Sequence, residues 1–209
     1  CKTNIINSVY LCGHACCCLE CAELIGPQCP YCRQNKNYTK LYLELDTEEI
    51  KLFCKEYQQN HESSTKSNNG GYQSHNLSLE TPVLQSLIRE IEWATSRGMH
   101  GKSQIIFNIW FNVNRYKDNN SSHFHPFSVY SGVYYVETPE NCGSIKFEHP
   151  ALDLLCYYNR GEGGLYTLPA IENTLYIFPS WLKHFVQANE NKDLNKEVNI
   201  SSSESDNKT

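Results

Sequence analysis

Metal-ligand side chains are concentrated at the start of the 209-residue sequence. Eight of the eleven cysteines fall within the first 32 residues, interleaved with His14. Soft thiolates in pairs two or three residues apart, together with an imidazole, are what tetrahedral zinc requires. The clustering suits a thiolate metal site in a reducing compartment better than a disulfide framework. The spacing therefore predicts zinc, held among Cys12, His14, Cys18, Cys21, Cys29 and Cys32.

The strings CGHACCCLEC and CPYCR resemble a RING domain of the inhibitor-of-apoptosis type, over residues 1–33. The resemblance implies two zinc sites in a cross-brace, one of Cys12, His14, Cys29 and Cys32, the other of Cys1, Cys18, Cys21 and a cysteine three residues before Cys1. We therefore expect the sequence to begin inside the motif. It also implies a ubiquitin-conjugating enzyme as partner, contacted by Pro30 and Arg33. A zinc knot that only holds a partner or the domain together is the alternative, and a head without metal stays open.

Three histidines in the second half of the chain have the spacing of a second metal site. His123 and His125 lie in SSHFHPFS, and His184 lies in FPSWLKHFV. Alternate residues of one strand face the same way, so His123 and His125 are expected to point together into a barrel mouth, joined by His184 from a distant strand. Non-haem iron oxygenases use two histidines and a carboxylate in this way. A third imidazole in place of the carboxylate leaves iron one charge more positive.

Three segments around these histidines resemble a family of 2-oxoglutarate- and iron(II)-dependent oxygenases: residues 67–74, 108–140 and 175–186. The resemblance covers about residues 66–200. It implies a double-stranded β-helix, iron(II) and 2-oxoglutarate as cofactors, and His123, His125 and His184 as the catalytic metal ligands. The reaction expected is hydroxylation or demethylation of an unknown substrate.

The same resemblance implies a cationic anchor for the far carboxylate of 2-oxoglutarate, about a dozen residues after the last histidine. At that place the family has Arg-Ile-Ser-Ile, whereas this sequence has Glu197-Val198-Asn199-Ile200, so an acid replaces the arginine. Lys196 would point to the opposite face of a regular strand and would serve only through a bulge or register shift. Asn114 and Tyr116 resemble the co-substrate-binding strand of nucleic-acid dealkylases, and Tyr116 is expected to donate its phenol to a carboxylate.

Helical and alternating patterns indicate the elements that position these residues. Residues 39–45 alternate as a strand, and a helix follows to Tyr57, capped by Asp46 or Thr47. A second helix is expected to run to Gly98 with Thr81 as its N-cap. Short β-rich runs then follow at 105–114, 131–136, 144–147, 164–168, 174–178 and 198–200. Many short strands after one helix are typical of a barrel or jelly roll.

The fold class expected is mainly β, a jelly-roll or cupin-like double-stranded β-helix with flanking helices, plus a small N-terminal RING zinc module. The domain organisation expected is a zinc module at 1–33, a connecting strand, helix and linker at 34–65, the oxygenase-like domain at 66–200, and a disordered tail at 201–209. Trp110, Trp181, Tyr134 and Tyr135 are expected to be core residues, and His149 a surface turn residue.

Composition limits the function classes. With a formal charge of −5 and a pI near 5.9, the chain has no general attraction to polyanions, so the sequence gives no strong nucleic-acid signal. No run reaches the roughly 18 apolar residues of a membrane helix, and no signal sequence opens the chain. We therefore expect no membrane partner and an intracellular location, cytoplasmic or nuclear.

The leading hypothesis is an oxygenase that carries a RING zinc finger with a role in ubiquitin transfer. The alternative is a ubiquitin-ligase-type RING protein whose barrel is an inactive recognition module, because a fold does not guarantee its chemistry. A zinc-binding adaptor without enzymatic activity is a third hypothesis. Succinate formation would favour the first of these, and ubiquitin chain assembly without it the second.

Overall fold

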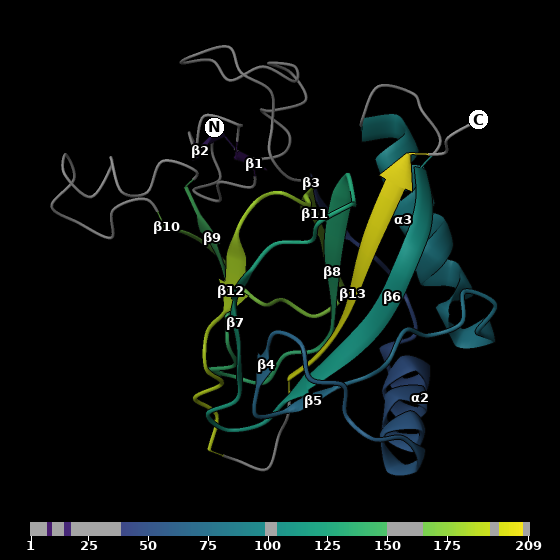
Figure 1. Ribbon diagram of the computed structural model, residues 1–209, viewed down its shortest axis with the longest axis vertical. Helices are drawn as coiled ribbons and strands as arrows, with labels where there is room; N and C mark the ends of the chain where they lie inside the picture. Colours follow the sequence, from purple (N-terminus) through teal and green to yellow (C-terminus); the bar gives the residue numbers. More distant parts are fainter. Residues whose placement is uncertain are drawn as a thin grey trace, which may run out of the picture.

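The computed structural model describes residues 8–9, 15–17, 39–98, 104–149, 165–192 and 197–206. Within them the chain is mainly β, with two large antiparallel sheets (Figure 1). The ligands expected in the cysteine-rich head, and Lys196, lie outside the described residues. The elements in chain order are β1 (Ser8–Val9), β2 (Ala15–Cys17), β3 (Thr39–Tyr42), α2 (Thr47–Asn60), β4 (Asn68–Asn69), β5 (Tyr72–Gln73), η1 (Pro82–Leu84), α3 (Gln85–Gly98), β6 (Gln104–Asn114), β7 (Asn119–His123), β8 (Tyr130–Glu137), β9 (Ile145–Glu148), β10 (Leu165–Leu168), β11 (Thr174–Pro179), β12 (His184–Val186) and β13 (Glu197–Asp206).

The two large sheets form the walls of the jelly roll. The major sheet has six strands in the order β3-β11-β8-β13-β6-β5, and the minor sheet has five in the order β10-β9-β12-β7-β4. Neighbours within each sheet are antiparallel, and most are not consecutive in the chain, as a jelly roll requires. The fold class expected from the sequence is therefore confirmed for the described residues.

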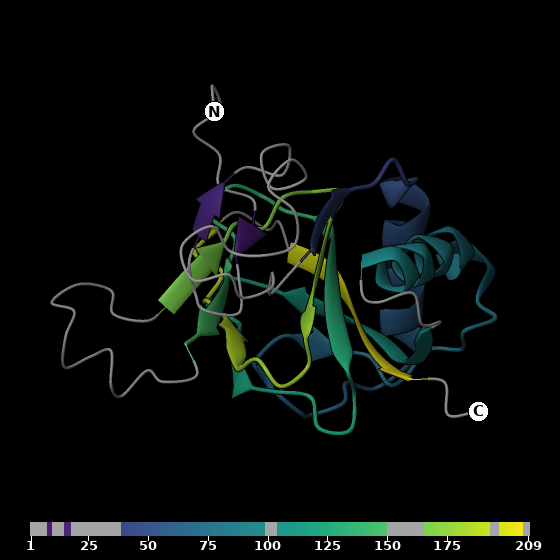
Figure 2. The same cartoon turned by 90° about the horizontal axis from the view of Figure 1, so that it is seen from above.

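Both helices pack on the outer face of the major sheet, as the two views show together (Figures 1 and 2). Helix α2 begins at Asp46, whose carboxylate accepts hydrogen bonds from the backbone N–H groups of Glu48 and Glu49 at 3.1 and 3.2 Å, the expected N-cap. Helix α3 buries an apolar stripe that includes Leu87, Ile88 and Ile91. The helices leave the inner face of the sheet free to build the site.

Strict alternation along β6 and β13 separates an apolar outer face from a polar inner face. The outer residues Ile109, Phe111, Val113, Val198 and Ile200 belong to the core beneath the helices. Their neighbours in sequence are polar or aromatic and point between the sheets: Asn112, Asn114, Glu197, Asn199 and Trp110. Because side chains in a strand alternate between faces, one register sets both the core and the interior of the barrel.

Several details differ from what the sequence predicted. Residues 34–65 were expected to connect two domains, yet β3 pairs with β11 and α2 packs in the core of the same barrel. The tail expected to be disordered from residue 201 continues β13 to Asp206, because its backbone finds partners on β6 and β8. Thr81 makes no side-chain cap, since the chain enters α3 through the 3-10 turn η1. Among the described residues no helix is long and apolar enough to cross a membrane.

Candidate metal centre

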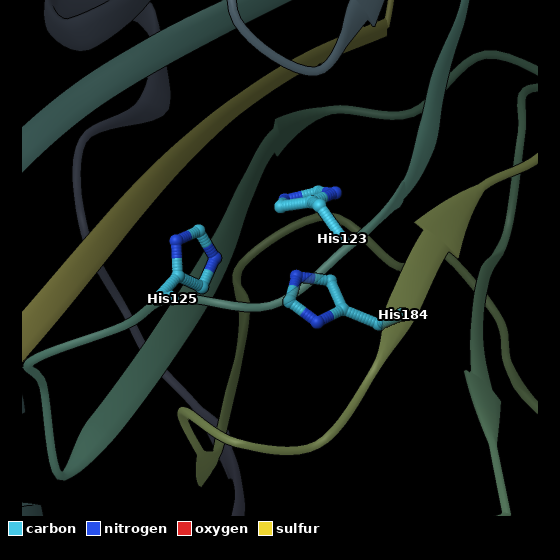
Figure 3. Close-up of side chains that lie close together, drawn as sticks. All are labelled: His123, His125 and His184. Carbon is cyan, nitrogen blue, oxygen red and sulfur yellow. The ribbon is translucent and has the colours of Figure 1, made fainter.

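The rings of the three histidines lie close together (Figure 3), beside an open cavity that we call the mouth of the barrel. His123 ends β7 and His184 begins β12, and the two residues are direct partners in the antiparallel pairing of these strands. One ring nitrogen from each of the three histidines lies within 4.8 Å of the others. Histidines 61 residues apart in the sequence are thus held together by strand register.

His125 is positioned differently from what alternation along one strand predicted. Strand β7 ends at His123, and His125 lies in the segment that follows. Its backbone N–H donates to the carbonyl oxygen of Ser180 at 3.0 Å. Ser180 follows β11, and its hydroxyl shares a buried hydrogen bond of 2.7 Å with that of Ser131. The Phe-Pro-Ser-Trp segment therefore holds the backbone of His125 from the opposite sheet.

Backbone carbonyls orient two of the three imidazoles. Nδ1 of His123 lies 2.7 Å from the carbonyl oxygen of Ser121, and Nδ1 of His184 lies 2.9 Å from that of Leu182. A carbonyl oxygen only accepts, so Nδ1 carries the proton in both rings. The lone pair then stands on Nε2, the usual arrangement when a backbone carbonyl orients a metal-binding histidine.

The environment keeps all three rings neutral. Burial lowers the pKa of His184 to about 3, helped by the nearby His123 and His125. Burial also lowers the pKa of His125 to about 4, with smaller contributions from His123 and Lys66, and it lowers the pKa of His123. Neutral imidazoles are the metal-binding form, so at neutral pH few protons compete for the site.

The donor set fits a divalent transition metal. Three neutral nitrogens suit iron, zinc, copper or nickel. Among the described residues no carboxylate joins the cluster. Glu148 follows Phe147, a strand partner of His184. Its carboxylate accepts a hydrogen bond from the Ser122 hydroxyl and lies 3.5 Å from Lys183 Nζ. His149 also stays outside the cluster. The metal would therefore keep its full charge and open positions for other ligands.

A cavity of about 620 Å³ opens beside His123 and His125. Lys66 is the one charged residue in its described lining, and Lys66 Nζ stands 5.7 Å from the ring centre of Trp110. Phe124 and Phe127 add exposed aromatic surface. Trp110, expected to be a core residue, is buried, and it also lines this cavity and contacts His125 with ring centres 5.5 Å apart. Trp181 was also expected in the core, yet it is 50% exposed.

Below the imidazoles the interior narrows to a cavity of about 30 Å³. Its polar lining includes Asn112, Asn120 and Asn199, which we call the amide floor. Asn114, predicted to bind the co-substrate, is buried beside this floor and donates to Asn120 Oδ1 at 3.1 Å. Tyr116 is 41% exposed and lines neither cavity; Lys117 Nζ stands 5.1 Å from its ring centre. The role given to Tyr116 stays a prediction.

Glu197 lies at the start of β13, opposite Asn114 on β6, and is fully buried. Asn199 Nδ2 donates to its Oε1 at 3.0 Å, and the Gly143 backbone N–H also donates to it. Burial raises the pKa of Glu197 to about 8. One lysine is buried among the described residues, Lys40 on β3, three strands from β13 in the sheet order and so roughly 14 Å away. The described interior therefore fits a metal ion at the histidines, but its floor does not fit the far carboxylate of 2-oxoglutarate.

Sequence reasoning missed the residues that support the histidines. The amide floor and the Ser131–Ser180 pair were not singled out, although Asn112 and Asn120 lie within a segment already recognised as informative. The available signal was alternation: polar residues at every second position of β6 and β13 mark an inner face that binds something other than core side chains.

Residues 108–201 match the family model described as "Putative 2OG-Fe(II) oxygenase". The matched segment contains all three histidines and the amide floor. No curated protein matches the sequence.

Solved structures share the fold at low sequence identity. A prolyl-4-hydroxylase from Pseudomonas putida has a TM-score of 0.60 and 10% identity, with 82% of this chain and 93% of that chain covered. The viral collagen prolyl hydroxylase of Paramecium Bursaria Chlorella virus-1, in complex with 2OG, has a TM-score of 0.57 and 12% identity, with 81% and 96% covered. HygX from Streptomyces hygroscopicus, with nickel and 2-oxoglutarate bound, has a TM-score of 0.62 and 9% identity, with 92% and 89% covered. These likenesses show that the chain shares the fold of these proteins.

Proposed function

We propose that the chain is an iron(II)-dependent oxygenase of the 2-oxoglutarate type, a hydroxylase or demethylase of an unknown substrate. The observation that carries the proposal is the cluster of His123, His125 and His184, three neutral imidazoles within 4.8 Å at the mouth of the jelly roll. The match of residues 108–201 to an oxygenase family supports it independently. In this type, bound iron(II) lets dioxygen place one oxygen atom in a substrate C–H bond and the other in a 2-oxo acid, which leaves as carbon dioxide and an acid one carbon shorter.

The protein's own contribution is to hold and shield the reacting groups. The carbonyls of Ser121 and Leu182 keep Nε2 of their histidines free for the metal. The 620 Å³ cavity admits the substrate from the side of His123 and His125. The inner cavity is small, and its apolar walls, which include Phe178 and Val186, would limit the water that reaches a metal held by the histidines.

Metal analysis of the anaerobically purified chain tests this proposal. We expect about one iron per chain at the histidines, and oxygen consumption that depends on a 2-oxo acid. Purified chain that takes up no iron(II) would rule the proposal out. Chain that binds iron but consumes no oxygen with any 2-oxo acid would favour the inactive recognition barrel.

For the cysteine-rich head we propose zinc binding, from the ligand spacing, and recruitment of a ubiquitin-conjugating enzyme through Pro30 and Arg33, from the resemblance to RING domains. The residues concerned lie outside those the structure describes. Replacing both Cys29 and Cys32 with serine should release about one zinc per chain and leave the iron content unchanged, because structural zinc is bound by thiolates. Unchanged zinc content would refute the cross-brace. Arg33→Ala should leave zinc in place and slow ubiquitin discharge.

A further inference from the structure

The inner face of the major sheet carries a directional row of hydrogen bonds. Asn112 Nδ2 donates to Asn199 Oδ1 at 3.0 Å, and Asn199 Nδ2 donates to Glu197 Oε1 at 3.0 Å. These residues are cross-strand neighbours, with Asn112 opposite Asn199 and Asn114 opposite Glu197. Each of the two amides uses one of its two N–H groups in the row, which points toward the acid, and Asn112 Nδ2 also lies 3.5 Å from the Ser201 hydroxyl.

The floor and the residues behind it contain buried polar atoms without hydrogen-bond partners. Asn112 Oδ1, Glu197 Oε2 and the Tyr135 hydroxyl are buried and make no hydrogen bond within the described residues. Tyr135 lies on β8 directly opposite Asn199, so it belongs to the same row. Of the three residues only Asn112 lines the inner cavity, and its unpaired atom is an amide oxygen that can only accept; Glu197 and Tyr135 lie behind the floor. Such a floor suits a neutral group and lacks the cation that a buried carboxylate needs.

Glu197 cannot supply that cation, because a carboxyl group is neutral when protonated and negative when ionised. With its pKa raised to about 8 by burial, the carboxyl is largely neutral at pH 7. The titratable groups that face it are Tyr135 on β8 and Cys142 in the following loop, whose own pKa values burial also raises. A neutral acid beside a phenol and a thiol removes charge repulsion but provides no counter-charge.

The available space agrees with the chemistry. The cavity between the imidazoles and the amide floor holds about 30 Å³, room for only one or two water molecules. Glu197 does not line it, because Asn199 stands in between. A five-carbon diacid that chelates a metal at the histidines would have to push its second carboxylate through the amide floor.

We propose that this barrel selects a 2-oxo acid without a second carboxylate, whose short, uncharged end rests on Asn112, Asn120 and Asn199, and that Glu197 is the residue that disfavours 2-oxoglutarate. The inference rests on the proposed function, because it assumes a metal at the histidines and a 2-oxo acid chelated to it. It assigns the co-substrate class from the floor of the barrel.

The test compares two co-substrates on the iron(II)-loaded 209-residue chain under anaerobic conditions. 2-Oxobutyrate ends in a methyl group, whereas 2-oxoglutarate ends in a carboxylate, and each gives a visible charge-transfer band when its keto acid chelates iron. We expect the 2-oxobutyrate band to reach half-saturation at a concentration about 10-fold or more lower than that of 2-oxoglutarate, since a lost charge-assisted hydrogen bond costs about this factor.

Two variants sharpen the comparison. Glu197→Arg should restore a cation and strengthen 2-oxoglutarate binding by about 10- to 100-fold. Glu197→Gln keeps the shape and neutrality of the protonated acid, so at pH 7 it should leave the order of the two co-substrates unchanged. Iron content and melting temperature show whether each variant is folded, and the wild-type comparison decides alone if the arginine variant is not.

The outcomes separate the two proposals. Tighter 2-oxoglutarate than 2-oxobutyrate binding by the wild-type chain overturns the co-substrate assignment and leaves the oxygenase proposal standing. A folded Glu197→Arg chain with no gain for 2-oxoglutarate overturns the role given to Glu197. If iron binds and neither acid gives a band, the proposed function fails, and the inference fails with it.

Discussion

At the mouth of the barrel three imidazoles face one point with their lone pairs free, whereas at its floor the amides of Asn112 and Asn199 donate toward a buried acid. The two regions share strands: the major sheet lines both cavities through Trp110. Burial also acts in opposite senses on the two groups, because it lowers the pKa of the histidines and raises that of Glu197. In each case the neutral form is favoured.

This difference separates the part of the barrel that suits the proposed oxygenase from the part that does not. A neutral imidazole is what a metal requires, so burial at the mouth prepares a site. The far carboxylate of 2-oxoglutarate requires a cation, and a neutral carboxyl is not one. Burial at the floor therefore leaves no anchor for that carboxylate. The candidate metal site and the floor therefore differ in what they can bind, although they lie on the same sheets.

The largest expected effect is at the mouth. His184→Ala removes the most buried of the three ligands and should weaken iron(II) binding by more than about 100-fold, since the loss of a group that merely orients a metal ligand already costs roughly 10- to 100-fold. Equilibrium dialysis under anaerobic conditions measures the change. His149→Ala is the matched control, and it should bind iron like the wild-type chain. Equal iron binding by His184→Ala and wild type would contradict the three-histidine site.

The next effect concerns the floor and the pH dependence of stability. The pKa of Glu197 is about 8 in the fold against 4.5 for a solvated group, so the unfolded chain releases this proton first as pH rises. The stability associated with the neutral acid is complete below pH 4.5 and is lost progressively up to pH 8. Glu197→Gln cannot ionise, so across this window its free energy of unfolding should rise relative to that of the wild type by a few kcal/mol.

Urea denaturation at about pH 5 and about pH 9, on either side of most of this window, measures the difference. We expect similar free energies of unfolding for the two chains at the lower pH and a higher value for Glu197→Gln at the higher pH. A constant difference at both values would show that Glu197 ionises normally in the fold. The histidines shift stability in both chains alike, so they cancel from the comparison.

The sequence predicted the mouth better than the floor for a physical reason. Histidines are rare and reactive, so three of them in two short segments indicate a common site through residue type and spacing alone. Strand register then brings His123 and His184 together as expected. The interior amides give a weaker signal, because asparagine is also common in turns. Only the pairing of β6 with β13 shows that Asn112 and Asn199 share a face.

The boundaries of the barrel were also beyond sequence reasoning. The alternation of Leu41, Leu43 and Leu45 predicts a strand, but its partner β11 lies more than 130 residues later in the chain. Likewise, the serine-rich run after Ile200 has no apolar pattern, yet it continues β13 because two neighbouring strands offer hydrogen bonds on both sides. Backbone pairing of this kind depends on tertiary context and leaves little trace in local composition.

The smallest effect tests how the mouth is held from the opposite sheet. Ser131→Ala leaves the buried Ser180 hydroxyl without its 2.7 Å partner and should lower the free energy of unfolding by about 1–3 kcal/mol. Because the Ser180 carbonyl holds the backbone of His125, iron binding should weaken as well, by about 10-fold or less. Ser128→Ala, also in the wall of the mouth cavity, is the matched control and should change neither quantity. If Ser131→Ala loses stability but binds iron with unchanged affinity, the serine pair packs the two strands together without positioning His125, and the third imidazole is then held by the loop itself.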